Sequence, residues 1–131
     1  MNRNREPVAR YMSAAPICVQ LGTELSVAAE LMQKHDIRHL PVLDANKLVG
    51  VVSERDLAIV ESLVPDDWER YPVAEAMTPS PHSVSPDTPL QDVARTMADH
   101  KYGCVLVVGP SGKLLGLFTT VDALNALASD P

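Results

Sequence analysis

The stretch Gly50-Val51-Val52-Ser53-Glu54-Arg55-Asp56 recurs later in the chain as Gly116-Leu117-Phe118-Thr119-Thr120-Val121-Asp122. In both copies a glycine precedes two apolar residues, a hydroxyl residue follows them, and an aspartate stands three positions after the hydroxyl. Because the two copies lie at matching places in two similar halves of the chain, they predict an internally repeated fold.

The repeat extends well beyond this motif. At a spacing of 65 positions the segment 8–13 matches the segment 73–78, and the apolar positions of a following helix also match. One extra residue in the second turn then changes the spacing to 66, at which Gly50 and Asp56 match Gly116 and Asp122. Two copies make a pseudo-symmetric pair, since each half is too small to bury a good core alone. We predict an N-terminal arm, expected to be mobile, over residues 1–7, a first domain over 8–64, a linker over 65–72 and a second domain over 73–131.

Each half predicts the same order of elements, which is strand, helix, strand, strand, helix. In the first half we expect strands at 17–20, 38–43 and 48–53, and helices that begin after Thr23 and after Ser53 as N-caps. In the second half, Thr88 as N-cap, Pro89 at the first helical position and Gln91 predict a capping box. Strands at 102–108 and 114–119 and a helix at 120–129 follow. A parallel crossover and an antiparallel hairpin then give each half a small mixed sheet with helices on one face, so the predicted fold class is mixed α/β.

The composition argues against several classes of protein. A net charge of −6 over 131 residues does not suit a nucleic-acid-binding protein, which needs a basic surface. No apolar run approaches the roughly 20 residues that cross a bilayer, and residues 1–7 lack the apolar core of a signal peptide. Cys18 and Cys104 lie in short apolar runs without zinc-like spacing, which is typical of buried thiols in a reducing compartment. We therefore predict a cytoplasmic protein that binds neither nucleic acid nor membrane.

The sequence gives little support to a catalytic or metal site. An enzyme needs a nucleophile with a base, or paired acids, and the only hydroxyl–acid pairs here are those of the repeated motif. His39 and His82 are far apart in the sequence, and no metal-binding spacing connects them. His35 and His100 end matching helices, where a positive charge favours the helix dipole. We predict no enzyme activity and no metal site, although Mg²⁺ could arrive with a polyphosphate ligand.

The repeated motif itself has two interpretations. A Ser or Thr at a helix N-cap with an acid three residues later is a helix-start signal worth about 1 kcal/mol, and local chemistry alone favours this interpretation. A ligand role gains support from the second copy and from Gly50 and Gly116, which leave room for a ligand or for another backbone. The helix N-terminus after the hydroxyl is a natural anion site, and a carboxylate there can accept hydrogen bonds from two ribose hydroxyls.

Together these features resemble a tandem pair of CBS domains, also called a Bateman module. The resemblance is carried by the two motif copies, the repeated order of elements and the run Arg38-His39-Leu40-Pro41-Val42, and it covers about residues 8–129. It implies two pseudo-symmetric β-α-β-β-α repeats that bind adenosine-containing ligands, such as AMP, ADP, ATP, NAD or S-adenosylmethionine, in two clefts between the halves. It also implies that the motif aspartate holds the ribose, that the Ser or Thr contacts ribose or phosphate, and that the protein is a homodimer.

The resemblance assigns residues from both halves to each cleft. The first cleft would contain Ser53, Arg55, Asp56, Arg38 and His39, with Thr78 and His82 from the other half. The second cleft would contain Thr119 and Asp122, with Ser13 and Ile17 from the first half. Arg38-His39 is matched by Gly103-Cys104 and Arg55 by Val121, so positive charge suited to phosphate is expected only in the first cleft. We therefore expect a phosphorylated adenosine ligand in the first cleft, and in the second cleft weaker binding, no ligand or a less charged one.

The favoured function is that of a non-enzymatic regulatory module. Ligand binding would change the relative angle of the two halves, and a partner protein would respond to that change. The alternative is a structural or interaction module whose clefts stay empty and whose dimer surface carries the function. The two hypotheses differ in a thermal shift experiment, because only the first predicts stabilisation by an adenosine compound.

Overall fold

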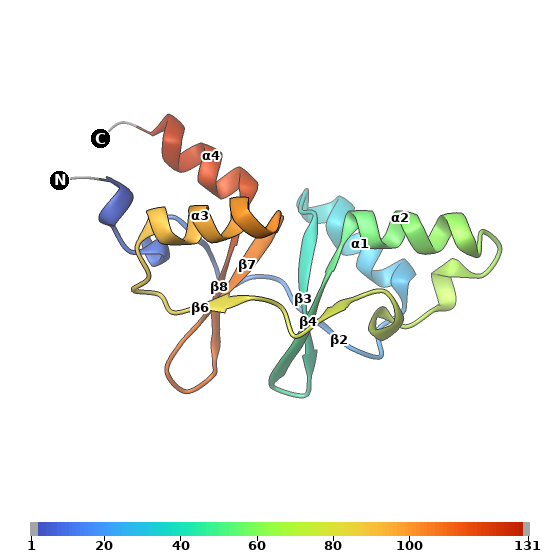
Figure 1. The fold of residues 1–131 in the computed structure, drawn as a ribbon. Helices are drawn as coiled ribbons and strands as arrows, with labels where there is room; N and C mark the ends of the chain where they lie inside the picture. The colour runs from blue at the N-terminus through green and yellow to red at the C-terminus, as the bar shows by residue number, and fades with distance from the viewer. Residues whose placement is uncertain (1–2, 130–131) are drawn as a thin grey trace. The chain divides into compact units, whose positions relative to one another are not determined.

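The computed structural model describes residues 3–129, which divide into two compact units (Figure 1). One unit, here called the Asp56 unit, consists of residues 17–81. The other, the Asp122 unit, combines residues 3–16 with residues 82–129. Each unit contains one copy of the repeated motif.

The Asp56 unit is a four-stranded mixed sheet with two helices. Along the chain it contains β2 (Val19–Gln20), α1 (Leu25–His35), β3 (His39–Asp44), β4 (Lys47–Ser53), α2 (Glu54–Leu63), the short helices η3 (Trp68–Arg70) and η4 (Val73–Glu75), and β5 (Thr78–Pro79). The strand order is β2-β3-β4-β5, with β2 parallel to β3 and the other pairs antiparallel. Figure 1 shows α1 and α2 together on one side of this sheet.

The Asp122 unit repeats this architecture. It contains the short helices η1 (Arg3–Arg5) and η2 (Val8–Arg10), then β1 (Ser13–Ala14), β6 (Ser83–Val84), α3 (Leu90–His100), β7 (Cys104–Val108), β8 (Leu114–Thr119) and α4 (Thr120–Ala128). Its strand order is β1-β8-β7-β6, with β6 parallel to β7 and the other pairs antiparallel. The predicted mixed fold, with a parallel crossover followed by a hairpin in each half, is therefore confirmed.

The fourth strand of each sheet was not predicted. It is only two residues long, and it comes from the beginning of the other sequence repeat: β1 pairs with β8, and β5 pairs with β4. The same exchange reaches the cores, because Val8 is buried in the Asp122 unit and Val73 in the Asp56 unit. The compact units therefore do not coincide with the sequence repeats. The boundaries at 8–64 and 73–131 describe the repeats in the sequence, and as domain boundaries they stay a prediction.

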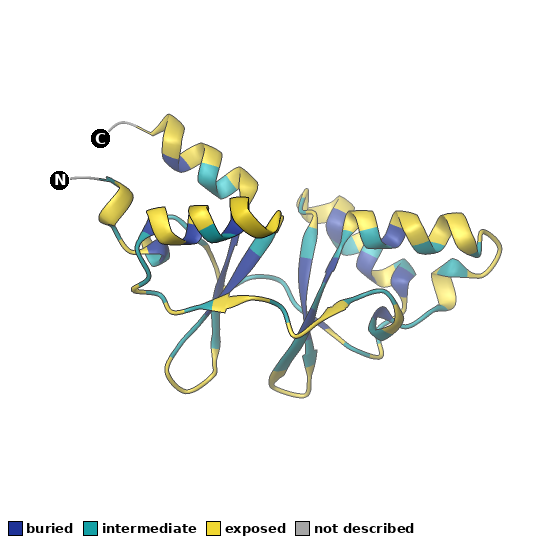
Figure 2. Cartoon of the chain, in the orientation of Figure 1, coloured by how far each residue is buried: buried dark blue, intermediate teal, exposed yellow. Residues whose placement is uncertain are grey.

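Each unit has its own core between the helices and the sheet, built of aliphatic side chains and, in the Asp122 unit, the fully buried Phe118. Figure 2 shows the buried residues along the central strands and on the inner faces of the helices. The apolar periodicity of the sequence predicts that Leu25, Ala28, Ala29 and Met32 in α1, and Leu90, Val93, Ala94 and Met97 in α3, face the core. All of these are buried except Ala29, which is half-buried, and Ala94, which is exposed. The linker residue Trp68 packs against the core of the Asp56 unit.

The predicted N-caps of α1 and α3 are wrong. The N-cap residues are Glu24 and Pro89, one position after the expected Thr23 and Thr88, and neither uses a side chain as a cap. Instead, backbone carbonyls from distant segments accept hydrogen bonds from the first amides of the two helices. The amide of Leu25 donates to the Tyr71 carbonyl, and the amide of Leu90 donates to the Glu6 carbonyl, each at 2.8 Å. The first amides of α1 and α3 are therefore satisfied by the segments around Tyr71 and Glu6, and not by the local side chains of Thr23 and Thr88.

Residues 3–7, predicted as part of a mobile arm, make defined contacts with the Asp122 unit. The guanidinium of Arg3 donates to the carbonyls of Leu127 and Ser129 at the end of α4. Pro7 forms a β-bridge with Pro89 at the start of α3. A guanidinium at the C-terminus of a helix satisfies carbonyls that have no partner within the helix. The segment therefore helps to fix both helices of this unit.

Candidate functional site

The first motif copy forms the junction between β4 and α2. Ser53 is the N-cap of α2, and its Oγ accepts a hydrogen bond from the Asp56 amide at 3.0 Å. In return, Oδ2 of Asp56 accepts a hydrogen bond from the Ser53 amide at 2.8 Å. This reciprocal capping box confirms the structural interpretation of the motif. It also fixes the half-buried carboxylate beside the N-terminus of a ten-residue helix while using only one of its oxygens.

The second motif copy forms the same capping box but has one additional partner. Thr119 caps α4, and the Asp122 carboxylate accepts hydrogen bonds from the Thr119 amide at 2.9 Å and from its hydroxyl at 3.2 Å. The hydroxyl of Ser13 on β1 also lies 3.2 and 3.3 Å from the two carboxylate oxygens of Asp122. The structure thus brings Ser13 and Asp122 together, as the resemblance implied. A ligand hydroxyl would have to compete with Ser13 for this carboxylate.

The remaining candidates of the Asp56 unit lie at the same end of its sheet. His39 begins β3 and is the cross-strand partner of Ser53, and the Arg38 carbonyl accepts a hydrogen bond from the Glu54 amide at 2.9 Å. Thr78 on β5 lies opposite Val51, two residues before Ser53 on the neighbouring strand. Sheet pairing therefore gathers the predicted residues of this unit around the start of α2.

The equivalent position in the Asp122 unit has the same backbone and different side chains. Cys104 is the cross-strand partner of Thr119, and the Gly103 carbonyl accepts a hydrogen bond from the Thr120 amide at 3.1 Å. Exposed Val121 stands where the Asp56 unit has the exposed Arg55. At the matching positions the Asp56 unit has Arg38, His39 and Arg55, and the Asp122 unit has Gly103, Cys104 and Val121. The effect of this difference on ligand binding stays a prediction.

Burial lowers the pKa of His39 below its ordinary value of 6.5, the nearby Asp56 carboxylate opposes this effect, and Arg38 adds to it. As the pH falls, the unfolded chain takes up the proton before the folded protein does. At pH values above the pKa that His39 has in the unfolded chain, His39 therefore stabilises the folded state. This stabilisation is lost as the pH falls through the lower pKa that His39 has in the folded protein.

We expect the thermal unfolding midpoint to decrease between about pH 7.5 and about pH 5.5, and His39→Gln to reduce this decrease. Calorimetric scans of both proteins across this range measure the effect. Identical pH profiles would show that His39 keeps its ordinary pKa in the fold.

Two predicted residues lie in the other unit from the motif to which they were assigned. His82 belongs to the Asp122 unit, where its ring stacks on Tyr102 with centroids 5.4 Å apart. Tyr102 also stacks on His100 at 5.1 Å. Ile17 belongs to the Asp56 unit. The roles of His82 and Ile17 in ligand binding remain predictions, and sequence spacing gave no signal of the ring stack.

The motif glycines are required by packing inside each unit. A Cβ atom on Gly50 would lie 2.9 Å from the Thr78 carbonyl oxygen and 2.5 Å from the Met77 sulfur. A Cβ atom on Gly116 would overlap the side chain of Met12. The sequence left open whether the motif glycines make room for a ligand or for another backbone. In the structure Gly50 makes room for the Thr78 carbonyl and Met77, and Gly116 makes room for the side chain of Met12. The repeated methionines were a signal for this contact that sequence reasoning did not use.

Neither a metal site nor a membrane span is found in residues 3–129. Over this range no three His, Cys, Asp or Glu residues are grouped so that they could hold a metal ion. Each helix in the same range is too short or too polar to cross a bilayer. Burial raises the pKa of the half-buried Cys18 thiol.

Comparison with known sequences supports the repeated architecture. The sequence pattern of the CBS domain matches residues 8–61 and again residues 73–129. The chain belongs to the CBS domain family. As a tandem CBS pair it is similar to the chloroplastic CBS domain-containing protein CBSX2 of Arabidopsis thaliana, with 33% identity over 135 residues, 82% of this chain and 57% of the relative. It is also similar to the inosine-5'-monophosphate dehydrogenase of Korarchaeum cryptofilum, with 38% identity over 97 residues, 72% of this chain and 19% of that enzyme.

Solved structures of other CBS pairs have the same fold. CBSX2 in complex with AMP aligns with a TM-score of 0.81 and 32% identity, covering 93% of this chain and 96% of that one. The CBS domain pair of protein MJ0100, in complex with 5-methylthioadenosine and S-adenosyl-L-methionine, aligns with a TM-score of 0.83 and 26% identity, covering 93% and 99% of the two chains. The chain spans less than three fifths of the length of the first curated relatives that it matches.

Proposed function

We propose that this CBS pair is a non-enzymatic regulatory module that binds adenosine-containing ligands. The observation that carries the proposal is the pair of matching sites, each with a carboxylate and a hydroxyl fixed by a capping box at a helix N-terminus. AMP in CBSX2, and the adenosine compounds in the MJ0100 pair, show which ligand class related pairs accept. A fixed carboxylate of this kind is suited to ribose hydroxyls, and a helix N-terminus is suited to phosphate.

The Asp56 site is the better candidate for a phosphorylated ligand. Asp56 would accept hydrogen bonds from the ribose, Ser53 and Thr78 would contact ribose or phosphate, and Arg38 and Arg55 would balance the phosphate charge. Asp122 is already hydrogen-bonded to Ser13 and Thr119 and has no basic side chain at the matching positions. We propose weaker binding, or a less charged adenosine ligand, at the Asp122 site.

Regulation would follow from a shift between conformations of the pair. A ligand that binds one conformation more tightly than another shifts the population toward it by its difference in affinity. We propose that the protein acts in the cytoplasm as a homodimer, that an unidentified protein partner detects this shift, and that Mg²⁺ accompanies only polyphosphate ligands. Nucleic acid is not proposed as a partner because the chain is acidic.

A thermal shift panel with AMP, ADP, ATP, NAD and S-adenosylmethionine tests the proposal. A ligand that binds only the folded state raises the unfolding midpoint as its concentration exceeds the Kd. We expect a clear increase with at least one compound, and none with inorganic phosphate or ribose at the same concentration. An unchanged midpoint with every adenosine compound would contradict ligand binding.

One observation favours the alternative, an interaction module without a ligand. Both motif aspartates are already engaged in capping boxes, so the motif has a structural role that needs no ligand. In that case the surface of the module would carry the function, and the same thermal panel would give no shift with any adenosine compound.

A further inference from the structure

The two motif aspartates differ in how many hydrogen bonds their carboxylates already accept. Within the described part of the chain, the Asp122 carboxylate accepts from three groups, which are the amide and the hydroxyl of Thr119 and the hydroxyl of Ser13. Over the same residues the Asp56 carboxylate accepts from one group, the amide of Ser53. An ionised carboxylate offers about four lone-pair positions, so Asp122 keeps about one of them for a ligand and Asp56 keeps about three.

The additional donor of Asp122 comes from a position at which the backbones of the two units match. Ser13 on β1 and Thr78 on β5 occupy equivalent positions of their strand pairs. Two residues later, Ala15 and Ser80 both adopt a left-handed φ, of 48° and 49°. Their amides donate to a carbonyl of the neighbouring strand at 3.2 Å in each unit. The difference between the two carboxylates therefore lies in the side chains and not in the course of the backbone.

The two matching side chains differ in their rotational freedom. Both Ser13 and Thr78 are exposed, but only the Ser13 hydroxyl reaches a motif carboxylate, and among residues 3–129 no hydrogen bond joins Thr78 to Asp56. Threonine carries a methyl group on Cβ that restricts its χ1 angle, whereas serine lacks this restriction. A serine at this position is therefore free to turn its hydroxyl toward the carboxylate.

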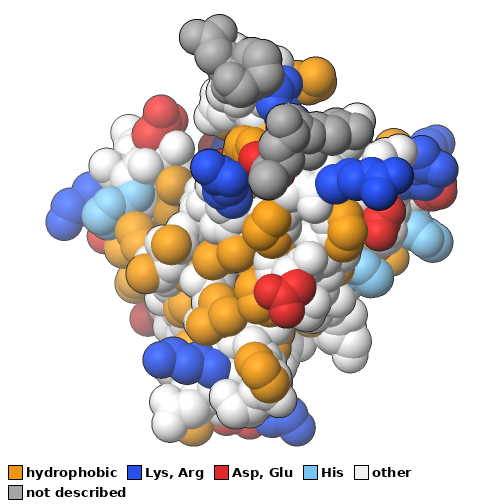
Figure 3. All heavy atoms as spheres, turned by 90° about the vertical axis from the view of Figure 1, so that its left-hand side faces the viewer, with side chains coloured by type: hydrophobic (Ala, Val, Ile, Leu, Met, Phe, Trp, Pro, Cys, Tyr) orange, Lys and Arg blue, Asp and Glu red, His pale blue; other side chains and the backbone are white. Residues whose placement is uncertain are grey.

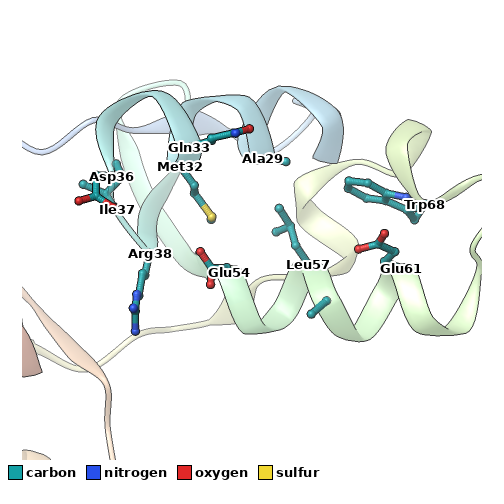
Figure 4. Close-up of a pocket in the computed structure, with 11 residues that line it drawn as sticks. Ala29, Met32, Gln33, Asp36, Ile37, Arg38, Glu54, Leu57, Glu61 and Trp68 are labelled. Carbon is teal, nitrogen blue, oxygen red and sulfur yellow. The ribbon is translucent and has the colours of Figure 1, made fainter.

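The surroundings of Asp122 suit a ligand without phosphate. Val121, directly before the aspartate, is 55% exposed, and Figure 3 shows hydrophobic side chains between charged ones on the side of the molecule where α4 lies. The Asp56 unit has a cation in its place: Figure 4 shows Arg38 at the end of the α1–α2 groove where Glu54 begins α2. A neutral nucleoside therefore compares the two carboxylates without this difference in charge.

We propose that Ser13 determines the sugar specificity of the Asp122 site, because it leaves the carboxylate able to accept a hydrogen bond from one sugar hydroxyl and not from both hydroxyls of a ribose. The inference rests on the adenosine binding proposed above and specifies the sugar at one of its sites. Ribose can donate from its 2′ and 3′ hydroxyls, whereas 2′-deoxyribose can donate from only one of the two. The Asp122 site therefore accepts both sugars equally, while the Asp56 site prefers ribose.

The Asp122 site is measured in a chain that carries Asp56→Asn, which weakens the other site. Two-dimensional NMR titrations of the isotope-labelled chain with adenosine and with 2′-deoxyadenosine give two dissociation constants, and the amides of Thr119 and Asp122 report binding at this site. We expect the two constants to agree within about twofold. Addition of Ser13→Ala should lower the constant for adenosine about 2- to 12-fold, the factor for one further hydrogen bond, and leave the constant for 2′-deoxyadenosine unchanged.

Thr78→Ala in a chain that carries Asp122→Asn is the matched control. The chain with Asp122→Asn alone should already bind adenosine about 2- to 12-fold more tightly than 2′-deoxyadenosine, because the Asp56 carboxylate can accept from both ribose hydroxyls. Since the Thr78 hydroxyl does not occupy this carboxylate, its removal frees no acceptor and should not increase the preference for adenosine. Circular dichroism of every variant confirms that the changes do not come from unfolding.

Three results would overturn the inference. If Ser13→Ala changes both dissociation constants equally or changes neither, then Ser13 does not act through the second sugar hydroxyl. If the Asp122 site strongly prefers adenosine while Ser13 is present, then the carboxylate accepts the whole diol despite that contact. If neither nucleoside binds this site before or after Ser13→Ala, then Ser13 does not control it. The proposed function is judged separately, by the thermal panel on the unmodified chain.

Discussion

Asp56→Asn is expected to raise the Kd for AMP about 10- to 150-fold, the range that corresponds to the loss of a hydrogen bond to a charged group. The amide oxygen of asparagine can replace Oδ2 and keep the hydrogen bond to the Ser53 amide, which is 2.8 Å in the structure. The other carboxylate oxygen then becomes an NH₂ group, which donates and cannot accept from a ribose hydroxyl. The capping box therefore survives while the proposed ligand contact is lost.

Two measurements separate this effect from a loss of folding. Isothermal titration calorimetry with AMP gives the affinity, and urea denaturation should show a loss of less than about 1 kcal/mol, from removal of one charge near a helix N-terminus. Asp122→Asn is the matched control, and we expect a smaller change in AMP affinity because its carboxylate is already hydrogen-bonded to Ser13. Equal losses in both variants would contradict the proposed difference between the sites.

The parts of the fold that depend on local sequence were predictable. The capping boxes of Ser53 and Thr119 each span four consecutive residues and need no distant partner, so their pattern was sufficient. The hairpins β3–β4 and β7–β8 were found for the same reason, since apolar runs on either side of a short turn specify them. The resemblance added the grouping of Ser13 with Asp122, which are 109 positions apart in the chain.

The failures occur where distant segments replace local signals. Thr23 and Thr88 have the chemistry of N-caps, but the carbonyls of Tyr71 and Glu6 already serve the first amides of α1 and α3. The strands β1 and β5 are two residues long, which is too short to show a period of two. Only the match between Gly50 and Gly116, opposite a repeated methionine, carried information about these strands.

Gly50→Ala is expected to lower the free energy of unfolding by about 1–3 kcal/mol, the cost of overpacking a well-packed interior. The new methyl group would lie 2.9 Å from the Thr78 carbonyl oxygen, which belongs to the paired strand β5 and cannot rotate away as a side chain can. Gly116→Ala should cost less, because the three nearest atoms all belong to the flexible side chain of Met12. Urea denaturation of both variants provides the comparison.

Gly22→Ala is the control for the intrinsic effect of the substitution. Gly22 is exposed, and a Cβ atom there would meet nothing within 4 Å, so we expect no loss of stability, or a gain of up to about 1 kcal/mol from a less flexible unfolded chain. If Gly50→Ala is as stable as Gly22→Ala, then β5 can move away from β4 without cost. In that case the exchanged segment would not be held by the close contact at Gly50, and the position of Thr78 near the Asp56 site would lose its physical basis.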